Sequence, residues 1–154
     1  AALLGASRLL STSLRPQALA RLNELRSAPD PRIAQLAEAQ RWRVAGMQST
    51  AAERAGWLRA IEAMPEPLQP GPYFALGLAQ QEAGDHEAAA LSLLRVAFVY
   101  PSHRALAARA ILEAARALQQ NGQAEYAQQL YREVIRDYKD QTRVTAEAQA
   151  RLQP

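Results

Sequence analysis

Apolar residues recur along the chain at the three- and four-residue spacing of an α-helix, in segments separated by short stretches rich in proline, glycine and polar residues. The last segment is a clear case, because Val144, Ala148 and Leu152 follow one another at intervals of four with polar residues between them. The same pattern predicts helices over about 2–10, 15–27, 31–46, 50–63, 72–83, 86–99, 103–120, 123–138 and 142–152. The connections are short, so we expect consecutive helices to pack antiparallel, as four pairs and one closing helix.

Residues at the ends of these segments favour the same boundaries. Asp30 followed by Pro31 is typical of a helix start, with Asp as the N-cap and Pro in the first turn. Thr50 and Glu53 have the spacing of a capping box. We also expect N-caps at Asp85 and Ser102, and helix stops at Gly84 and at Asn121 with Gly122.

Two residue types recur at intervals longer than a single helix. Pro29, Pro65 and Pro101 are 36 residues apart, and Gly46, Gly84 and Gly122 are 38 residues apart. A fixed period of this size is typical of helix pairs stacked side by side. The sequence therefore predicts an all-α fold, an α–α superhelix of about four antiparallel helix pairs with a C-terminal capping helix over 142–152.

One unit carries the densest set of signals: Tyr73, Leu76, Gly77, Gly84, Ala89 and Pro101. In this order and spacing they resemble the tetratricopeptide repeat, whose pattern is an aromatic residue, Leu-Gly, a turn glycine, a small residue in the second helix and a closing proline. We expect Gly77 to let the second helix approach closely at Ala89. Gly84 is expected to take the left-handed conformation of the turn.

The resemblance covers most of the chain unevenly. The following pair keeps Ala115, Gly122, Ala127, Tyr131 and Val134 in register but has Lys139 in place of the proline. Residues 71–139 therefore read as two well-matched repeats. Residues 1–66 read as degenerate repeats, and generic helix pairs stacked on the repeats remain an alternative for them. We expect residues 1–154 to form a single domain.

The resemblance implies a groove lined by the first helix of each pair. The residues expected on its wall are Phe74, Leu78 and Gln81 from one helix, and Arg109, Leu112, Arg116 and Gln119 from the next. Apolar groups beside two arginines suit an apolar segment that carries an acidic residue. The alternative is that the preceding helix pair, residues 31–63, covers Phe74 and Leu78. We do not carry over the carboxylate-binding set of some family members, because Phe74 and Leu78 occupy matching positions of the stripe.

Composition excludes several kinds of chemistry. The chain has no cysteine, and its formal charge is +3. His86 and His103, its two histidines, are expected to be solvated, and no metal-binding or phosphate-loop motif occurs. Carboxylates such as Glu82 and Asp85 are expected on ion-paired helix faces, and Trp42 and Trp57 as fillers between helix pairs. We therefore expect no metal, no cofactor and no catalytic activity.

The function predicted from these features is that of an interaction scaffold for a protein or peptide partner, as the repeat module of a larger bacterial protein. One alternative is an accessory domain of an enzyme whose catalytic part lies elsewhere. Another is a single-stranded RNA-binding repeat, but only Arg109 and Arg116 would make its groove basic, so no nucleic acid is expected.

The expected location of the chain rests on its apolar runs, its first residues and the family resemblance. No apolar run is long enough for a membrane span. The first ten residues are a poor signal peptide, because they lack a basic leader and Arg8 interrupts their apolar stretch. Without an initiating Met, the chain is expected to be part of a longer or processed protein. The resemblance includes bacterial envelope proteins, which favours the cell envelope over the cytoplasm.

Overall fold

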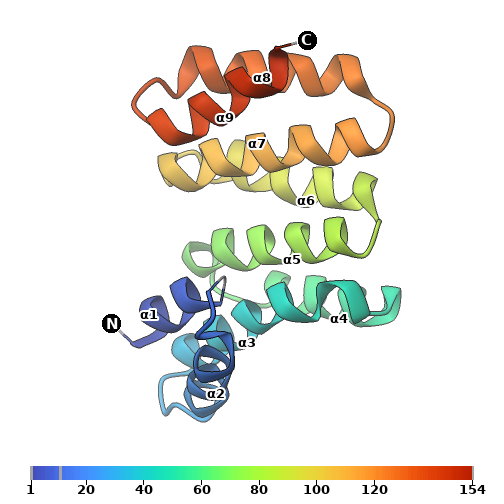
Figure 1. Cartoon of the computed structure of the whole chain (residues 1–154). Helices are drawn as coiled ribbons and strands as arrows, with labels where there is room; N and C mark the ends of the chain where they lie inside the picture. Colours follow the sequence, from blue (N-terminus) through green and yellow to red (C-terminus); the bar gives the residue numbers. More distant parts are fainter. Residues whose placement is uncertain (1, 11, 154) are drawn as a thin grey trace.

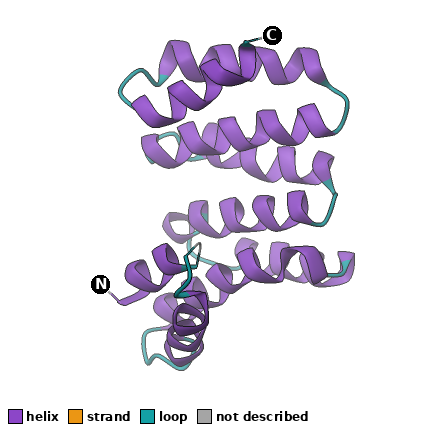
Figure 2. Cartoon of the chain, in the orientation of Figure 1, coloured by secondary structure: helices purple, strands orange, loops and turns teal. Residues whose placement is uncertain are grey.

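The computed structural model describes residues 2–10 and 12–153, and over these residues the chain is helical, with no strand (Figure 2). Every helix predicted from the sequence is found within two residues of its expected ends. The nine α-helices of this part are α1 (Ala2–Leu9), α2 (Arg15–Leu25), α3 (Pro31–Ala45), α4 (Ala51–Glu62), α5 (Pro70–Glu82), α6 (His86–Val99), α7 (Arg104–Gln120), α8 (Ala124–Asp137) and α9 (Thr142–Leu152). Two short 3₁₀ turns, η1 (Gly46–Gln48) and η2 (Glu66–Leu68), follow α3 and α4.

The helices pack mainly against their neighbours in the sequence. Helices α5, α6, α7 and α8 lie one above another in Figure 1, with α9 beside α8 and α7, and with α1, α2 and α3 grouped at the opposite end. The apolar core accordingly divides into three main clusters along this direction, around Leu22 in α2, around Trp42 and Leu76 in α3 and α5, and around Tyr131 in α8. None of the described helices has the length and apolar character needed to cross a membrane.

Helices α5 and α6 approach each other closely at Gly77, as the sequence predicts. A Cβ atom at Gly77 would lie 2.6 Å from Leu93 Cγ and 3.3 Å from the carbonyl oxygen of Ala89. The turn after α5 is made by Gly84, whose φ of 81° is in the left-handed region. Its N–H donates to the carbonyl of Gln81 at 3.1 Å, which ends the helix. Gly122 ends α7 in the same conformation, with φ 77°.

The predicted helix pair α3 and α4 differs from the other pairs. Helix α3 has its main contact with α5, and it meets α4 through two aromatic rings. The indoles of Trp42 and Trp57 are stacked 5.2 Å apart, with 8° between their planes. Trp42 is buried and Trp57 is partly buried, so both fill space between helices as expected. The pair therefore packs through these two rings, without the close backbone contact of the other predicted pairs.

Two helix starts agree with the sequence prediction. Asp30 Oδ1 accepts a hydrogen bond from the backbone N–H of Arg32 at 2.9 Å, and Thr50 and Glu53 form the complete capping box.

Of two other expected N-caps, Asp85 is in place but lacks the capping hydrogen bond, and Ser102 is wrong. Asp85 occupies the N-cap position of α6 without a side-chain cap, and its carboxylate lies 3.7 Å from the guanidinium of Arg54 instead. Helix α7 begins at Arg104, so the N-cap position belongs to His103 and not to Ser102. In each case the residue at the N-cap has a ψ near 60°, which differs from the extended backbone of Asp30 and Thr50.

Candidate functional site

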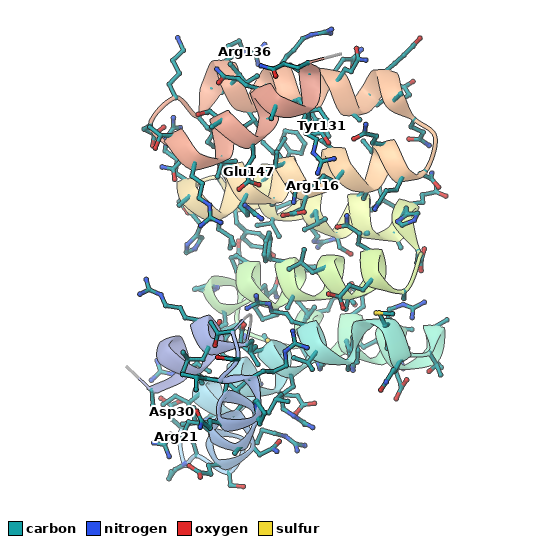
Figure 3. All side chains as sticks on the ribbon, viewed as in Figure 1. Arg21, Asp30, Arg116, Tyr131, Arg136 and Glu147 are labelled. Carbon is teal, nitrogen blue, oxygen red and sulfur yellow. The ribbon has the colours of Figure 1, made fainter. Side chains whose placement is uncertain are left out.

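The C-terminal half of the predicted groove is closed. Leu112 is fully buried, at 0% exposure, in the apolar cluster that also contains Tyr131 and Ala148. Helix α9 packs against α7 and brings Glu147 to Arg116, as Figure 3 shows. The expectation that Leu112 lines an open groove is therefore wrong, because the closing helix covers this part of α7.

The two groove arginines are engaged by carboxylates of the same chain. Arg109 Nη2 lies 2.8 Å from Glu113 and its Nη1 lies 3.1 Å from Glu147. Arg116 contacts the same two carboxylates, each at 3.0 Å. Burial acts to raise the pKa of Glu147, but Arg109, Arg116 and Arg143 together outweigh burial and lower that pKa. The acidic group that the sequence pattern assigned to a partner is thus supplied here by α9.

The remaining groove residues have separate environments. Phe74 is half-buried against the central cluster, which agrees with the alternative that the preceding helices cover it. The amide of Gln81 donates to Gln120 at 3.1 Å and joins α5 to the end of α7. Gln119 is exposed and accepts a hydrogen bond from the hydroxyl of Tyr131 at 3.1 Å.

Leu78 is half-buried and lines a cavity, which we call the Leu78 cavity. This cavity has a volume of about 630 Å³, and α2, α3, η1, α5 and the turn after α1 contribute to its walls. Its lining residues are Leu10, Arg15, Arg43, Val44, Met47, Gln48, Leu78 and Glu82. The cavity thus combines an apolar wall with two guanidinium groups and one carboxylate.

The guanidinium of Arg43 is bound by neutral groups. Its Nη1 donates to Gln40 Oε1 at 3.2 Å, and to the carbonyl and hydroxyl oxygens of Ser7 at 3.4 Å each. Burial lowers the pKa of Arg43, and the charge of Glu82 partly offsets this effect. Arg15, at the start of α2, donates from Nε to the carbonyl of Leu10 at 2.9 Å. Both cations therefore face the cavity while held by uncharged acceptors.

Glu82 lies across the end of α3. Burial raises the pKa of its carboxyl group, while Arg15 and Arg43 act in the opposite direction. Among the described residues Glu82 forms no ion pair within 4.0 Å. The expectation of an ion-paired helix face is thus wrong for Glu82.

Gly46 allows the close approach of α3 and α5 that places this carboxylate. A Cβ at Gly46 would lie 2.5 Å from Glu82 Oε2 and 2.9 Å from Ala79 Cα. Any side chain at this position would therefore press against the backbone of α5.

The histidines and carboxylates offer no other site in the described residues. His103 is exposed, as predicted. His86 is half-buried and its Nδ1 has no hydrogen-bond partner in the described part, which differs from the expected solvated side chain. No group of three or more potential metal ligands gathers in residues 2–10 and 12–153. The chemistry available in the Leu78 cavity is therefore the binding of charged and apolar groups.

Comparison of the chain with protein-family models, with curated proteins and with solved structures gives no match. Of the cavity residues, the sequence pattern identified Leu78 as a binding residue but not Arg15, Arg43 or Glu82. A stripe along one helix can be found from its spacing, whereas these three side chains come from three different helices. The one available signal was the glycine at position 46, which marks the place where α3 meets α5.

Proposed function

We propose that the chain is an interaction module that binds a segment of a protein partner at the Leu78 cavity. An acidic side chain of the segment lies against Arg15 and Arg43, and an apolar side chain lies against Leu78 and Val44. The observation that carries the proposal is the guanidinium of Arg43, which is partly buried and bound only through neutral groups in the described part. A charge taken from water without a counter-charge is costly, so an incoming carboxylate is favoured there.

The repeat signature supports the same proposal. Four residues stand where a tetratricopeptide repeat would need them. Gly77 and Ala89 lie at the close contact of α5 and α6, Gly84 makes the turn between these helices, and Pro101 follows the end of α6. We propose that the chain is a superhelix of such repeats, with α9 as its closing helix, and that it acts as the repeat module of a larger bacterial protein. Helical repeats of this kind present extended surfaces to peptide segments.

Selection of random peptides displayed on phage, with the full chain immobilised, tests the proposal. We expect enrichment of peptides in which Asp or Glu stands beside a large apolar residue. Arg43→Gln is expected to weaken the selected peptides about tenfold, because a hydrogen bond between charged groups contributes about 1.5–3 kcal/mol. Arg132→Gln is the control, since Arg132 is exposed on α8 and donates to Gln128. Selected peptides that bind equally well to Arg43→Gln and Leu78→Asp would exclude this cavity as their site.

A further inference from the structure

Groups of opposite charge face the Leu78 cavity without forming an ion pair with one another. Arg15 and Arg43 are near enough to Glu82 to oppose the rise of its pKa, yet no direct ion pair joins them in the described residues. The cavity therefore holds two positive groups and one negative group around a common space. A ligand that carries charges of both signs would match all three.

Some carboxylates elsewhere in the chain lie directly against an arginine. Asp140 lies 2.7 Å from Arg104, Glu147 lies 3.0 Å from Arg116, and Glu38 lies 2.6 Å from Arg26. Arginine side chains are long enough to close such pairs on the surface of this protein. Glu82 lines the same cavity as Arg15 and Arg43 and is not closed on either of them.

We propose that the Leu78 cavity binds an α-amino acid with an aliphatic side chain. Its carboxylate is held by Arg15 and Arg43, its ammonium group by Glu82, and its side chain by Leu78 and the neighbouring apolar wall. The ligand uses the same cavity as the partner segment of the proposed function, and the inference rests on that function only in the choice of site. The partner segment and the amino acid both contain a carboxylate. The amino acid also has an ammonium group, which Glu82 would bind.

The size and construction of the cavity agree with such a ligand. Its volume of about 630 Å³ is within the range of roughly 300–1,000 Å³ that is usual for small-molecule sites. Half of its lining residues are apolar, and the other half, Arg15, Arg43, Gln48 and Glu82, are polar or charged. Gly46 lets α5 lie close to the end of α3, and this contact brings the carboxylate of Glu82 beside the end of α3.

Isothermal titration calorimetry of the full chain with three matched probes tests the inference. L-leucine carries both charges, N-acetyl-L-leucine lacks the ammonium group, and L-leucinamide lacks the carboxylate. We expect leucine to bind about tenfold more tightly than either analogue, because each analogue leaves one charged group of the cavity unpartnered. Equal binding of leucine and N-acetyl-leucine would identify a plain anion site and overturn the inference, as would the absence of heat with leucine.

Two variants assign the charges to residues. In Glu82→Gln, the preference for leucine over N-acetyl-leucine should disappear while leucinamide stays weak. In Arg43→Gln, the preference for leucine over leucinamide should disappear or fall sharply. Glu125→Gln, at an exposed position on α8, is the control and should change neither preference. Preferences that persist in both cavity variants contradict the inference.

The amino-acid titration and the peptide selection fail independently. Peptides that bind while leucine does not would overturn the amino-acid site and leave the interaction module standing. Leucine binding without any selected peptide would overturn the interaction module and leave the amino-acid site standing. Circular dichroism of each variant shows whether a lost preference reflects a lost fold.

Discussion

At the scale of single residues, arginine has several distinct roles in this chain, and its neighbours decide which. Arg95 lies 4.8 Å above the ring of Tyr73, where the ring face attracts the cation. Arg104 closes on the carboxylate of Asp140 at 2.7 Å. Arg43 faces the Leu78 cavity with neutral partners. A basic composition therefore does not by itself predict a positive binding surface, because carboxylates of the chain neutralise many of these cations.

The pair formed by Arg104 and Asp140 gives a prediction about pH. Hydrogen bonds, first from the side chain of Arg104 and next from that of Gln141, lower the pKa of Asp140 from 3.8 to about 2. Because the folded-state pKa is depressed, the stabilisation is present above pH 3.8 and is lost as the pH falls toward about 2. We expect Arg104→Ala to raise the pKa of Asp140 toward 3.8. Titration of the carboxyl carbon by NMR measures this, and Arg132→Ala should leave the pKa of Asp140 unchanged. A pKa near 2 in Arg104→Ala would show that Gln141, which also donates to Asp140, is sufficient.

The site residues could be predicted only in part at this scale. Leu78 was found because it lies on one helical stripe with Phe74 and Gln81, and such stripes follow from spacing alone. Arg15 and Arg43 were missed because their position beside Leu78 depends on how α2 and α3 meet α5. Leu112 was placed on an open wall because nothing in the spacing of α7 indicates that α9 covers it.

At the scale of helices and turns, the glycine interval correctly marked three positions where helices end or meet. It did not show that the three glycines have different roles there. Gly84 and Gly122 both have positive φ and end their helices. Gly46 belongs to the same series, but its φ of −45° is helical. Its small size matters instead, because a Cβ there would meet Ala79 of α5 at 2.9 Å. A period in the sequence therefore indicates where helices end or touch, and only the packing tells which.

The contact between α5 and α6 gives a second prediction. Gly77→Ala places a methyl group 2.6 Å from Leu93 Cγ, so the helices must separate or Leu93 must leave its rotamer. We expect a loss of about 1–3 kcal/mol in the free energy of unfolding, the usual cost of overpacking. Gly56→Ala is the matched control, because its nearest neighbour would be Arg59 at 3.9 Å and alanine is the better helix former. That variant should gain roughly 0.5–1 kcal/mol. Urea denaturation measures both, and an unchanged midpoint for Gly77→Ala would mean that the interface yields without cost.

At the scale of the whole molecule, the helices and their order were predictable, while two long-range contacts were not. The helix boundaries follow from periodicity, prolines and glycines, which act within a few residues of one another. The contact of α3 with α5 and the cover of α7 by α9 depend instead on the volumes of Trp42 and Trp57 and on the charge of Glu147. Such features decide between several packings of the same helices, so they become visible only when the helices are assembled.

Because most of the helices pack mainly on their sequence neighbours, damage at one end should stay local. In the repeat array that we propose, stability is close to a sum of terms from adjacent units. Leu22 is fully buried in the cluster of α1, α2 and α3, so Leu22→Ala should destabilise that cluster by about 2–5 kcal/mol. We expect hydrogen exchange, followed by mass spectrometry, to show lost protection in α1, α2 and α3 and native protection in α7 and α8. Val134→Ala, in the cluster at the other end, should give the opposite pattern, with protection lost in α7 and α8 and native in α1, α2 and α3. Equal loss of protection along the chain in either variant would instead show that the three clusters unfold as one cooperative unit.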